Sequence, residues 1–299
     1  MKRVHLAPGI WHLQSGSNMG LGVQDGKGLL IDAGLDKDAA RRALRALDEL
    51  NVALAGLFLT HAHADHFGGA HVVQRRTEAR TYAPILEAAM MEHPLIEPLY
   101  LFGGAAPIAE LCHKFTLAEP CQVDQVMTAP GPLQIGPLQV EAVPLPGHSP
   151  HQMGVAVGDV LFCADALFPI ETLEKHHVTF CVDLDRTLET LERLPTLPYA
   201  HFAPGHGPAY AAGEEIARVC AANRERLEQV RALVYDALDE PHETPALVRH
   251  VADHYGLRLK TATSYFLTRT TVLAALSSLE RAGEASVAMK GNHLWWQKQ

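Results

Sequence analysis

The segment Thr60–His66 concentrates side chains that can bind metal ions. Within six residues it holds His61, His63, Asp65 and His66, in the pattern H-x-H-x-D-H. His61 and His63 are two positions apart, so on an extended segment they point the same way. Asp65 and His66 follow where a helix could begin, and can face a second ion. Imidazole and carboxylate ligands suit zinc, iron or manganese, so the segment predicts a site for two adjacent metal ions.

Three further ligand candidates lie downstream, each in a loop after a short apolar strand or in a Gly/Pro turn. His148 follows Pro146 and Gly147, Asp165 follows a strand expected over residues 160–163, and His206 lies between two glycines. Rigid strands commonly position functional loops in this way. Any one of these histidines alone would be interpreted as part of an ordinary surface turn. Together, and in this order after the first motif, they favour one joint metal site.

The order of these motifs resembles the metallo-β-lactamase-fold superfamily over roughly residues 1–212, including an early strand and turn at residues 29–34. The resemblance implies an α+β protein, an αβ/βα four-layer sandwich with the metals at one edge between the two sheets. It also implies that Asp32 orients a ligand loop and binds no metal. The ligands that it implies are His61, His63 and His148 for the first metal, Asp65, His66 and His206 for the second, and Asp165 as a bridge between both.

A pair of metals in such a site predicts hydrolysis. Two cations close together lower the pKa of a shared water toward ~7, which gives a hydroxide that attacks an acyl or phosphoryl centre. In this family Asp65 lies near the nucleophile, so it is expected to take up or relay a proton. The expected cofactor is two zinc ions, with iron or manganese also suited to these ligands. No serine or cysteine nucleophile is required.

The composition excludes several classes of protein. Hydrophobic residues make up 47% of the chain and charged residues 20%, as in soluble globular proteins. No apolar run approaches the ~18 residues of a membrane span, and no apolar region follows the basic N-terminal residues as in a signal peptide. The five cysteines are scattered and include no C-x-x-C pair, which argues against a disulfide framework or a cysteine zinc site. We expect a cytoplasmic location.

The charge is distributed unevenly along the chain. The net charge is −9, and residues 1–212 carry 14 lysines and arginines against 23 acidic residues, whereas residues 213–299 carry 11 of each. An acidic catalytic half repels polyanions, so nucleic acid is disfavoured as a substrate.

The first part alternates short strands with helices. A hairpin is expected over residues 20–32, a helix over 36–50, and a strand over 54–60 that leads into the metal loop. Further strands are expected over 140–144 and 153–157, and a helix over 185–194.

Residues 84–120 are apolar but too interrupted by proline and glycine for one long helix. They are either a packed connector or a lid over the metal site. As a lid they would contact a substrate with an apolar portion. Residues shortly after Asp165 also border the predicted pocket, with an ordinary surface position as the alternative. The candidate pocket residues are Leu99, Tyr100, Phe102, Phe168, His176 and His177, with Glu171 and Phe180 as similar candidates.

Residues 213–299 are predicted to form a second, smaller domain. Helical patterns cover residues 214–238 and 262–282, with a shorter helix between Thr244-Pro245 and Gly256, and Gly291-Asn292 marks a closing hairpin. This is the element order of a winged helix, which could bind nucleic acid. Its neutral charge differs from the strongly basic character of a duplex binder. A cap that shapes the pocket or a dimer interface is therefore favoured.

A sandwich followed by a winged helix resembles the β-lactamase-like protein 2 group, whose metal motif is related to that of hydroxyacylglutathione hydrolase (glyoxalase II). The tail does not resemble the glutathione-binding domain of glyoxalase II. The resemblance implies a hydrolase of a small thioester, ester or lactone. The alternatives are a metal-dependent endoribonuclease of the β-lactamase-like protein 2 type and a nucleic-acid-binding regulator with a vestigial metal site. The sequence leaves open the acyl group, the native metal and the oligomeric state.

Overall fold

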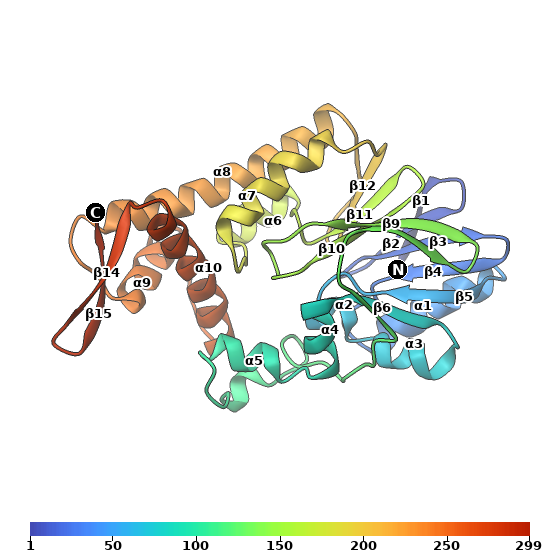
Figure 1. Ribbon diagram of the computed structural model, residues 1–299, viewed down its shortest axis with the longest axis horizontal. Coiled ribbons are helices and arrows are strands. Elements are labelled where there is room, and N and C mark those ends of the chain that lie inside the picture. Colours follow the sequence, from blue (N-terminus) through green and yellow to red (C-terminus); the bar gives the residue numbers. More distant parts are fainter.

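Two β-sheets lie face to face in the first two thirds of the chain (Figure 1). The computed structural model describes residues 1–299. The first sheet has seven strands in sequential order. Its members β1 to β4 pair antiparallel, and β4 to β7 pair parallel. The strands are β1 Lys2–Ala7, β2 Ile10–Gln14, β3 Met19–Gln24, β4 Lys27–Ile31, β5 Ala53–Phe58, β6 Arg80–Pro84 and β7 Gln125–Met127.

The second sheet has six strands in the order β13-β12-β11-β10-β9-β8. All neighbours pair antiparallel except β11 and β12, which are parallel. The strands are β8 Gly131–Ile135, β9 Leu138–Pro144, β10 Met153–Val157, β11 Val160–Ala164, β12 His201–Pro204 and β13 Tyr210–Ala211. Because β9, β11 and β12 run in the same direction, their carboxyl ends meet at one edge of this sheet.

Helices cover the outer face of each sheet. Apolar residues of β4, β5, β10 and β11 form the core between the sheets. One outer core joins the first sheet to α1 and α3, and another joins the second sheet to α7 and α8. This layering confirms the mixed α+β sandwich. The helices are α1 Lys37–Glu49, α2 Ala64–Phe67, α3 Ala70–Arg76, α4 Ile85–Glu92, α5 Ile96–Leu101, α6 Ile170–His176, α7 Leu184–Arg193, α8 Glu214–Ala237, α9 Thr244–His254 and α10 Ala262–Arg281, with short 3₁₀ turns at Ala109–Leu111 and Leu194–Thr196.

Local signals set the ends of several elements. The β3–β4 hairpin turns at Asp25 and Gly26, which both have positive φ. The Asp36 side chain accepts from two backbone N–H groups at the start of α1, and Asp183 accepts from one at the start of α7. Residues 84–120 form the short helices α4 and α5 and a 3₁₀ turn, so the expectation that they hold no single long helix is confirmed.

The C-terminal part contains three helices and a hairpin, in the predicted order. Strands β14 (Ala285–Lys290) and β15 (His293–Lys298) pair antiparallel around Gly291 and Asn292, which both have positive φ. Glu243 is the residue that precedes α9 at its N-terminal cap, and its side chain makes no capping hydrogen bond. The Thr244 hydroxyl accepts a hydrogen bond from Trp296 Nε1, which joins α9 to the hairpin.

A single hydrophobic core joins the second sheet to the C-terminal helices. It includes Leu161 and Phe202 of the sheet together with Leu247 of α9 and Leu276 of α10. Helix α8 runs along both parts and connects them (Figure 1). Helix α10 returns toward α5, so that a C-terminal element lies beside the 84–120 segment. No helix of the protein combines the length and apolar character needed to span a membrane.

Thr271 anchors α10 to the rest of the protein. Its buried hydroxyl donates to Thr179 O at 3.0 Å and accepts from Cys181 N at 3.3 Å. We predict that Thr271→Val lowers the free energy of unfolding by about 2 kcal/mol, because both backbone groups lose their partner while side-chain volume is kept. Urea unfolding measures the change. In the control Thr270→Val the lost hydroxyl bonds only within α10, to Phe266 O, and an equal loss there would contradict the prediction.

Candidate metal centre

Seven side chains converge where the carboxyl ends of the central strands meet. The loop after β5 supplies four of them, the loop after β9 supplies one, and the ends of β11 and β12 supply one each. Their ligand atoms form three overlapping groups, within each of which all atoms lie within 4.8 Å of one another. The groups are His61, His63 and His148; His61, His66 and Asp165; and Asp65, His66 and His206. The structure thus brings together all seven residues that the sequence singled out as ligands.

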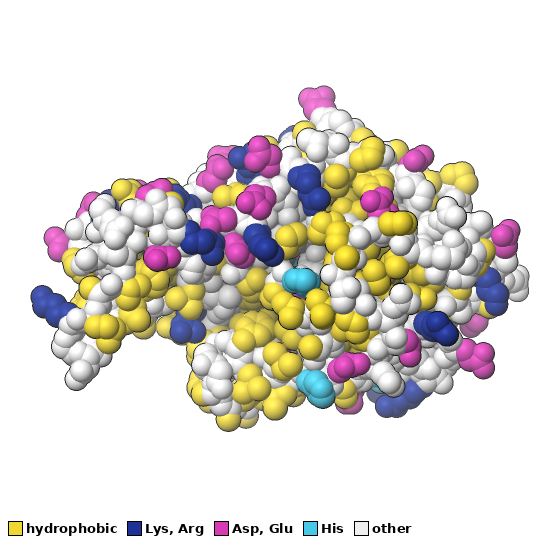
Figure 2. Space-filling view, viewed as in Figure 1, with side chains coloured by type: hydrophobic (Ala, Val, Ile, Leu, Met, Phe, Trp, Pro, Cys, Tyr) yellow, Lys and Arg dark blue, Asp and Glu magenta, His cyan; other side chains and the backbone are white.

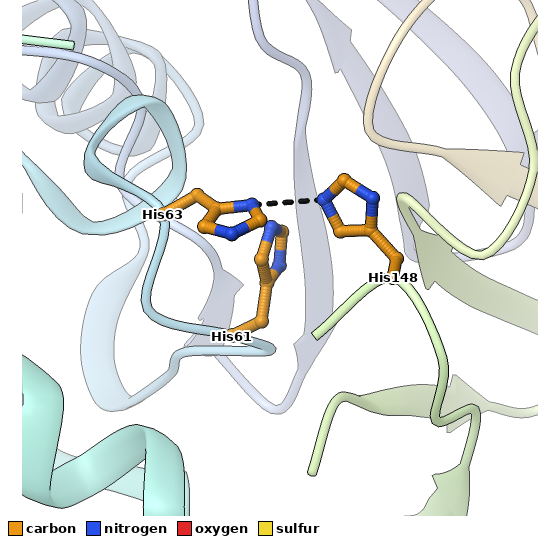
Figure 3. Close-up of side chains that lie close together, drawn as sticks. All are labelled: His61, His63 and His148. Carbon is orange, nitrogen blue, oxygen red and sulfur yellow. Dashed lines mark hydrogen bonds between the residues drawn. The ribbon is translucent and has the colours of Figure 1, made fainter. Parts of the chain in front are cut away.

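The first group comprises three imidazoles on opposing loops (Figure 3). His61 and His63 project from the loop after β5, and His148 faces them from the loop after β9. His63 Nδ1 lies 2.8 Å from His148 Nε2. All three rings are in edge-to-face contact with one another. Their nitrogens therefore point at a common volume.

The second group and Asp165 lie directly beside the first. Asp65 Oδ2 is 3.4 Å from His206 Nε2 and 3.7 Å from His66 Nε2. The Asp165 carboxylate is 3.3 Å from His66 Nε2, 3.4 Å from His206 Nε2 and 3.6 Å from His148 Nε2. Asp165 is thus the one carboxylate within reach of histidines from both groups.

Hydrogen bonds fix the orientation of the histidine rings. His148 Nδ1 donates to Phe180 O at 3.0 Å, and His206 Nδ1 donates to Gly16 O at 2.9 Å. A carbonyl oxygen can only accept, so the proton of each neutral ring lies on Nδ1 and the lone pair on Nε2 faces the centre. The His66 ring is oriented in the same way, because its Nδ1 bonds to a buried carboxylate.

That carboxylate belongs to Asp32, which is 3% exposed and lies just after β4. Its Oδ2 accepts from His66 Nδ1 at 2.9 Å, and its Oδ1 accepts from Thr60 N at 2.8 Å. The Thr60 hydroxyl also bonds to Asp32 and lies 3.0 Å from His61 Nδ1. Asp32 therefore orients candidate ligand histidines from both groups without facing the centre itself.

Three buried ligand atoms at the centre have no hydrogen-bond partner: His61 Nε2, His66 Nε2 and Asp165 Oδ1. Buried polar atoms are seldom left unsatisfied. A cation at the focus of these atoms would satisfy them, and imidazole with carboxylate is a donor set that zinc, iron and manganese accept. The residues present therefore fit metal ions.

The electrostatics of the two groups differ. Burial, together with neighbouring imidazoles, lowers the pKa of His61 well below its usual value and that of His63 to about 3, which favours the neutral form that binds metal. The Asp165 carboxylate raises the pKa of His206 to about 10. The pKa of Asp165 is held well below its ordinary value, because His206 and His66 outweigh the effect of burial. A carboxylate that attracts protons to these imidazoles would also attract metal cations.

Gly205 leaves the space that the centre occupies. A Cβ atom at this position would lie 2.2 Å from Asp165 Oδ1 and 2.6 Å from His66 Cε1. The glycine before His206 is therefore needed for close packing against two candidate ligands.

A cavity of about 760 Å³ opens beside the centre. Figure 2 shows this face hollowed between the C-terminal helices and the rest of the molecule, with hydrophobic side chains around the hollow. Its walls come from the centre itself, from the 84–120 segment, from α6 with the loop after it, and from α10. Residues that line it outside the centre include Glu97, Phe115, Phe168, Lys175, His176, Phe180 and Leu267.

The structure places the predicted pocket residues unevenly. Phe168 and His176 line the cavity, as does Phe180, whereas Glu171 does not. Four other predicted pocket residues do not line the cavity, and the prediction is corrected for them: Leu99, Tyr100, Phe102 and His177.

These residues have other neighbours. Phe102 packs edge-to-face on Phe266 of α10, and Tyr100 packs against the core of the first sheet. His177 stacks on Tyr255 and accepts a hydrogen bond from Arg226. Leu99 lies on the same short helix as Glu97, which faces the cavity in its place.

A protein-family model described as the metallo-beta-lactamase superfamily matches residues 14–206. Hydroxyacylglutathione hydrolases from Albidiferax ferrireducens and Shewanella pealeana are 28% identical over 139 residues and 26% identical over 162 residues. These alignments cover 45% and 53% of this chain and 42% and 48% of those proteins, so the chain spans about half the length of these relatives. A probable metallo-hydrolase from Bacillus subtilis is 24% identical over 62% of this chain and 82% of that protein.

Two solved structures share the fold over nearly the whole chain. They are a beta-lactamase domain protein from Burkholderia ambifaria and a metallo-beta-lactamase family protein from Thermus thermophilus. Each has a TM-score of 0.72 and 19% identity over 99% of this chain, covering 93% and 100% of the respective neighbour. The shared fold therefore includes the C-terminal helices and hairpin.

Glu87 is a site residue that sequence reasoning missed. Its fully buried carboxylate accepts from Ala62 N at 2.9 Å, and from Ser149 Oγ and His151 N at 2.8 Å each. It thereby ties the loop of His61 and His63 to the loop of His148. The only signal in the sequence is an acidic residue within the otherwise apolar run from Ile85 to Met91.

We predict that Glu87→Gln weakens metal binding about 10- to 100-fold, the usual effect of losing a group that orients ligands. A glutamine amide turns an N–H₂ group toward backbone N–H or hydroxyl donors, which separates the two loops. The affinity of each variant for zinc or cobalt is measured by competition with a chelator. Glu92→Gln is the matched control, because Glu92 lies on the same helix and accepts only from Val123 N. Equal affinities in both variants would rule out this role.

Proposed function

This chain belongs to the metallo-beta-lactamase superfamily, and we propose that it is a dinuclear metal-dependent hydrolase that cleaves a small thioester, ester or lactone. The observation that carries the proposal is the seven-residue centre at the base of a cavity of about 760 Å³. Cavities of roughly 300–1,000 Å³ are typical of small-molecule sites. The relatives named hydroxyacylglutathione hydrolase support thioester chemistry.

We assign the first metal to His61, His63 and His148, the second to Asp65, His66 and His206, and the bridging position to Asp165. Zinc is the proposed metal, with iron or manganese as alternatives that suit the same donors. When bound, two such ions supply Lewis acidity toward a carbonyl oxygen and a lowered pKa for a water between them. The remaining chemistry belongs to side chains of this protein.

Asp65 is the proposed proton acceptor. Its side chain is partly exposed to the cavity, and its Oδ2 accepts a hydrogen bond from Ser17 Oγ at 2.8 Å. Ser17 and the neighbouring imidazoles hold the carboxylate in one orientation, so that it can take a proton from the attacking water and return it to the leaving group. Phe115, Phe168 and Leu267 offer apolar surface to the acyl or leaving portion.

We infer that residues 1–212 are the catalytic domain and that residues 213–299 are a winged-helix-like domain that caps it. In a winged helix that reads DNA, the recognition helix must be free to enter a groove. In this chain α10 occupies that position in the element order, and none of its residues from 262 to 279 is exposed. Three of its side chains (Thr263, Leu267 and Thr268) line the cavity instead. This placement favours a small-molecule hydrolase over an endoribonuclease or a nucleic-acid-binding regulator. We also propose that the protein is cytoplasmic and that it forms a homodimer.

The test is turnover of the zinc-loaded protein on an acyl-glutathione thioester, a simple lactone and a single-stranded RNA. We predict hydrolysis of the thioester or lactone, loss of that activity on chelation with recovery on adding zinc, and at least a roughly 100-fold loss in His61→Ala, since each ligand acts as part of one unit. The control His71→Ala removes a histidine whose Nδ1 bonds only to Gly68 O.

Each other outcome decides between the alternatives. RNA cleavage without thioester or lactone hydrolysis would overturn the proposal in favour of an endoribonuclease. Binding of RNA that weakens steeply with salt, without any turnover, would favour the regulator. Full activity in His61→Ala would overturn the metal mechanism.

A further inference from the structure

Glu97 is a buried acid that faces the cavity. It lies on α5, is 6% exposed, and lines the cavity together with Asp65 and His63. It is not a member of any of the groups that could hold a metal. Its carboxylate therefore lies near the centre without belonging to the ligand set.

The Glu97 carboxylate has no partner within the protein. Three other acids of the same segment each have one: Glu87 accepts from three donors, Glu92 from Val123 N and Glu110 from Ala262 N. Glu97 makes no side-chain hydrogen bond and no ion pair. The contrast separates Glu97 from the acids that hold this segment in place.

Leaving such a group unpaired is costly. A buried charge without a hydrogen-bonding or ionic partner is strongly disfavoured in proteins. Burial, and then the negative charges of Asp65 and Glu87, raises the pKa of Glu97 well above its ordinary value, so the neutral carboxyl is favoured unless a cation lies beside it. No basic side chain offsets this effect, although Lys175 lines the same cavity. Glu97 thus offers the pocket a carboxyl group for which the protein supplies no partner, and a cationic group bound beside it would stabilise the ionised form.

We propose that Glu97 binds a positively charged amino group of the substrate. An ammonium group carries three donors and a full charge, and a charge-assisted hydrogen bond to a carboxylate is among the strongest of neutral-pH contacts. The apolar side chains of Phe115 and Leu267, which line the same cavity, would contact the carbon chain that leads to this group. The inference rests on the proposed function and narrows its substrates to amine-bearing thioesters or esters.

Whether the substrate carries an amino group can be tested with the wild-type protein alone. Two pairs of thioesters would be compared. In one pair the acyl portion carries either an ammonium group or a methyl group in its place, and in the other pair the thiol portion carries either group. We expect kcat/KM to be roughly 10- to 100-fold higher for the amine-bearing member of one pair, as for a hydrogen bond to a charged group. The pair that shows the preference identifies which portion of the substrate lies against Glu97.

The variant Glu97→Gln should reduce that preference to near unity, and Glu92→Gln should retain it. Calorimetry with unreactive thioether analogues, one with the amine and one with the methyl group, gives a second readout that does not depend on turnover. Equal binding of the two analogues to the wild-type protein, or a preference that survives in Glu97→Gln, would overturn the inference. Hydrolysis of both members of each pair at equal rates would overturn it while leaving the proposed function intact. If neither thioester is hydrolysed, the proposed function fails, and the calorimetry alone decides on Glu97.

Discussion

The arrangement of the centre depends on one buried carboxylate, that of Asp32. Its backbone has a φ of 61°, in the left-handed region that residues other than glycine seldom adopt. The side chain accepts from Thr60 N, the Thr60 hydroxyl and His66 Nδ1, which accounts for both of its oxygens. The hydroxyl in turn meets His61 Nδ1. A single acid at the end of β4 thus holds the loop after β5 and sets two imidazoles, one from each side of the centre.

Much of the fold and centre could be predicted because the signals are local. The seven candidate ligands lie in turns that follow apolar strands, and strand direction alone brings such turns to one edge. Glu87 and Glu97 carry no such signal, because their importance arises from loops and helices distant in sequence. The apolar character of residues 84–120 also does not reveal which neighbour each side chain packs on. Phe102, for example, is expected in the pocket from the sequence but contacts Phe266 of α10 instead. The order of the C-terminal elements was predictable, but not the return of α10 to the cavity.

The position of α10 links stability to the shape of the cavity. Thr271 holds its middle against residues 179–181, and near its N-terminal end Ala262 N donates to Glu110 Oε1 while His113 Nε2 and Thr263 Oγ1 are in hydrogen-bond contact. The helix therefore bridges two segments that both border the cavity. Since α8 and α10 share one hydrophobic core with the second sheet, the C-terminal part cannot move as an independent body without exposing that core. Such a wall suits a fixed small-molecule pocket better than a surface that must open for a polymer.

The charges around the cavity would impose an orientation on a thioester or ester that carries an amino group. The centre gathers Asp65 and Asp165, and two divalent cations there would leave it with net positive charge. A carbonyl oxygen is drawn toward such a centre, whereas an ammonium group is repelled from it. Glu97, on a different wall from the ligand loops, would stabilise that ammonium group by charge-assisted hydrogen bonding. Opposite charges at two points of one cavity would then align the scissile bond with Asp65, so that recognition of the amino group also places the reacting carbonyl.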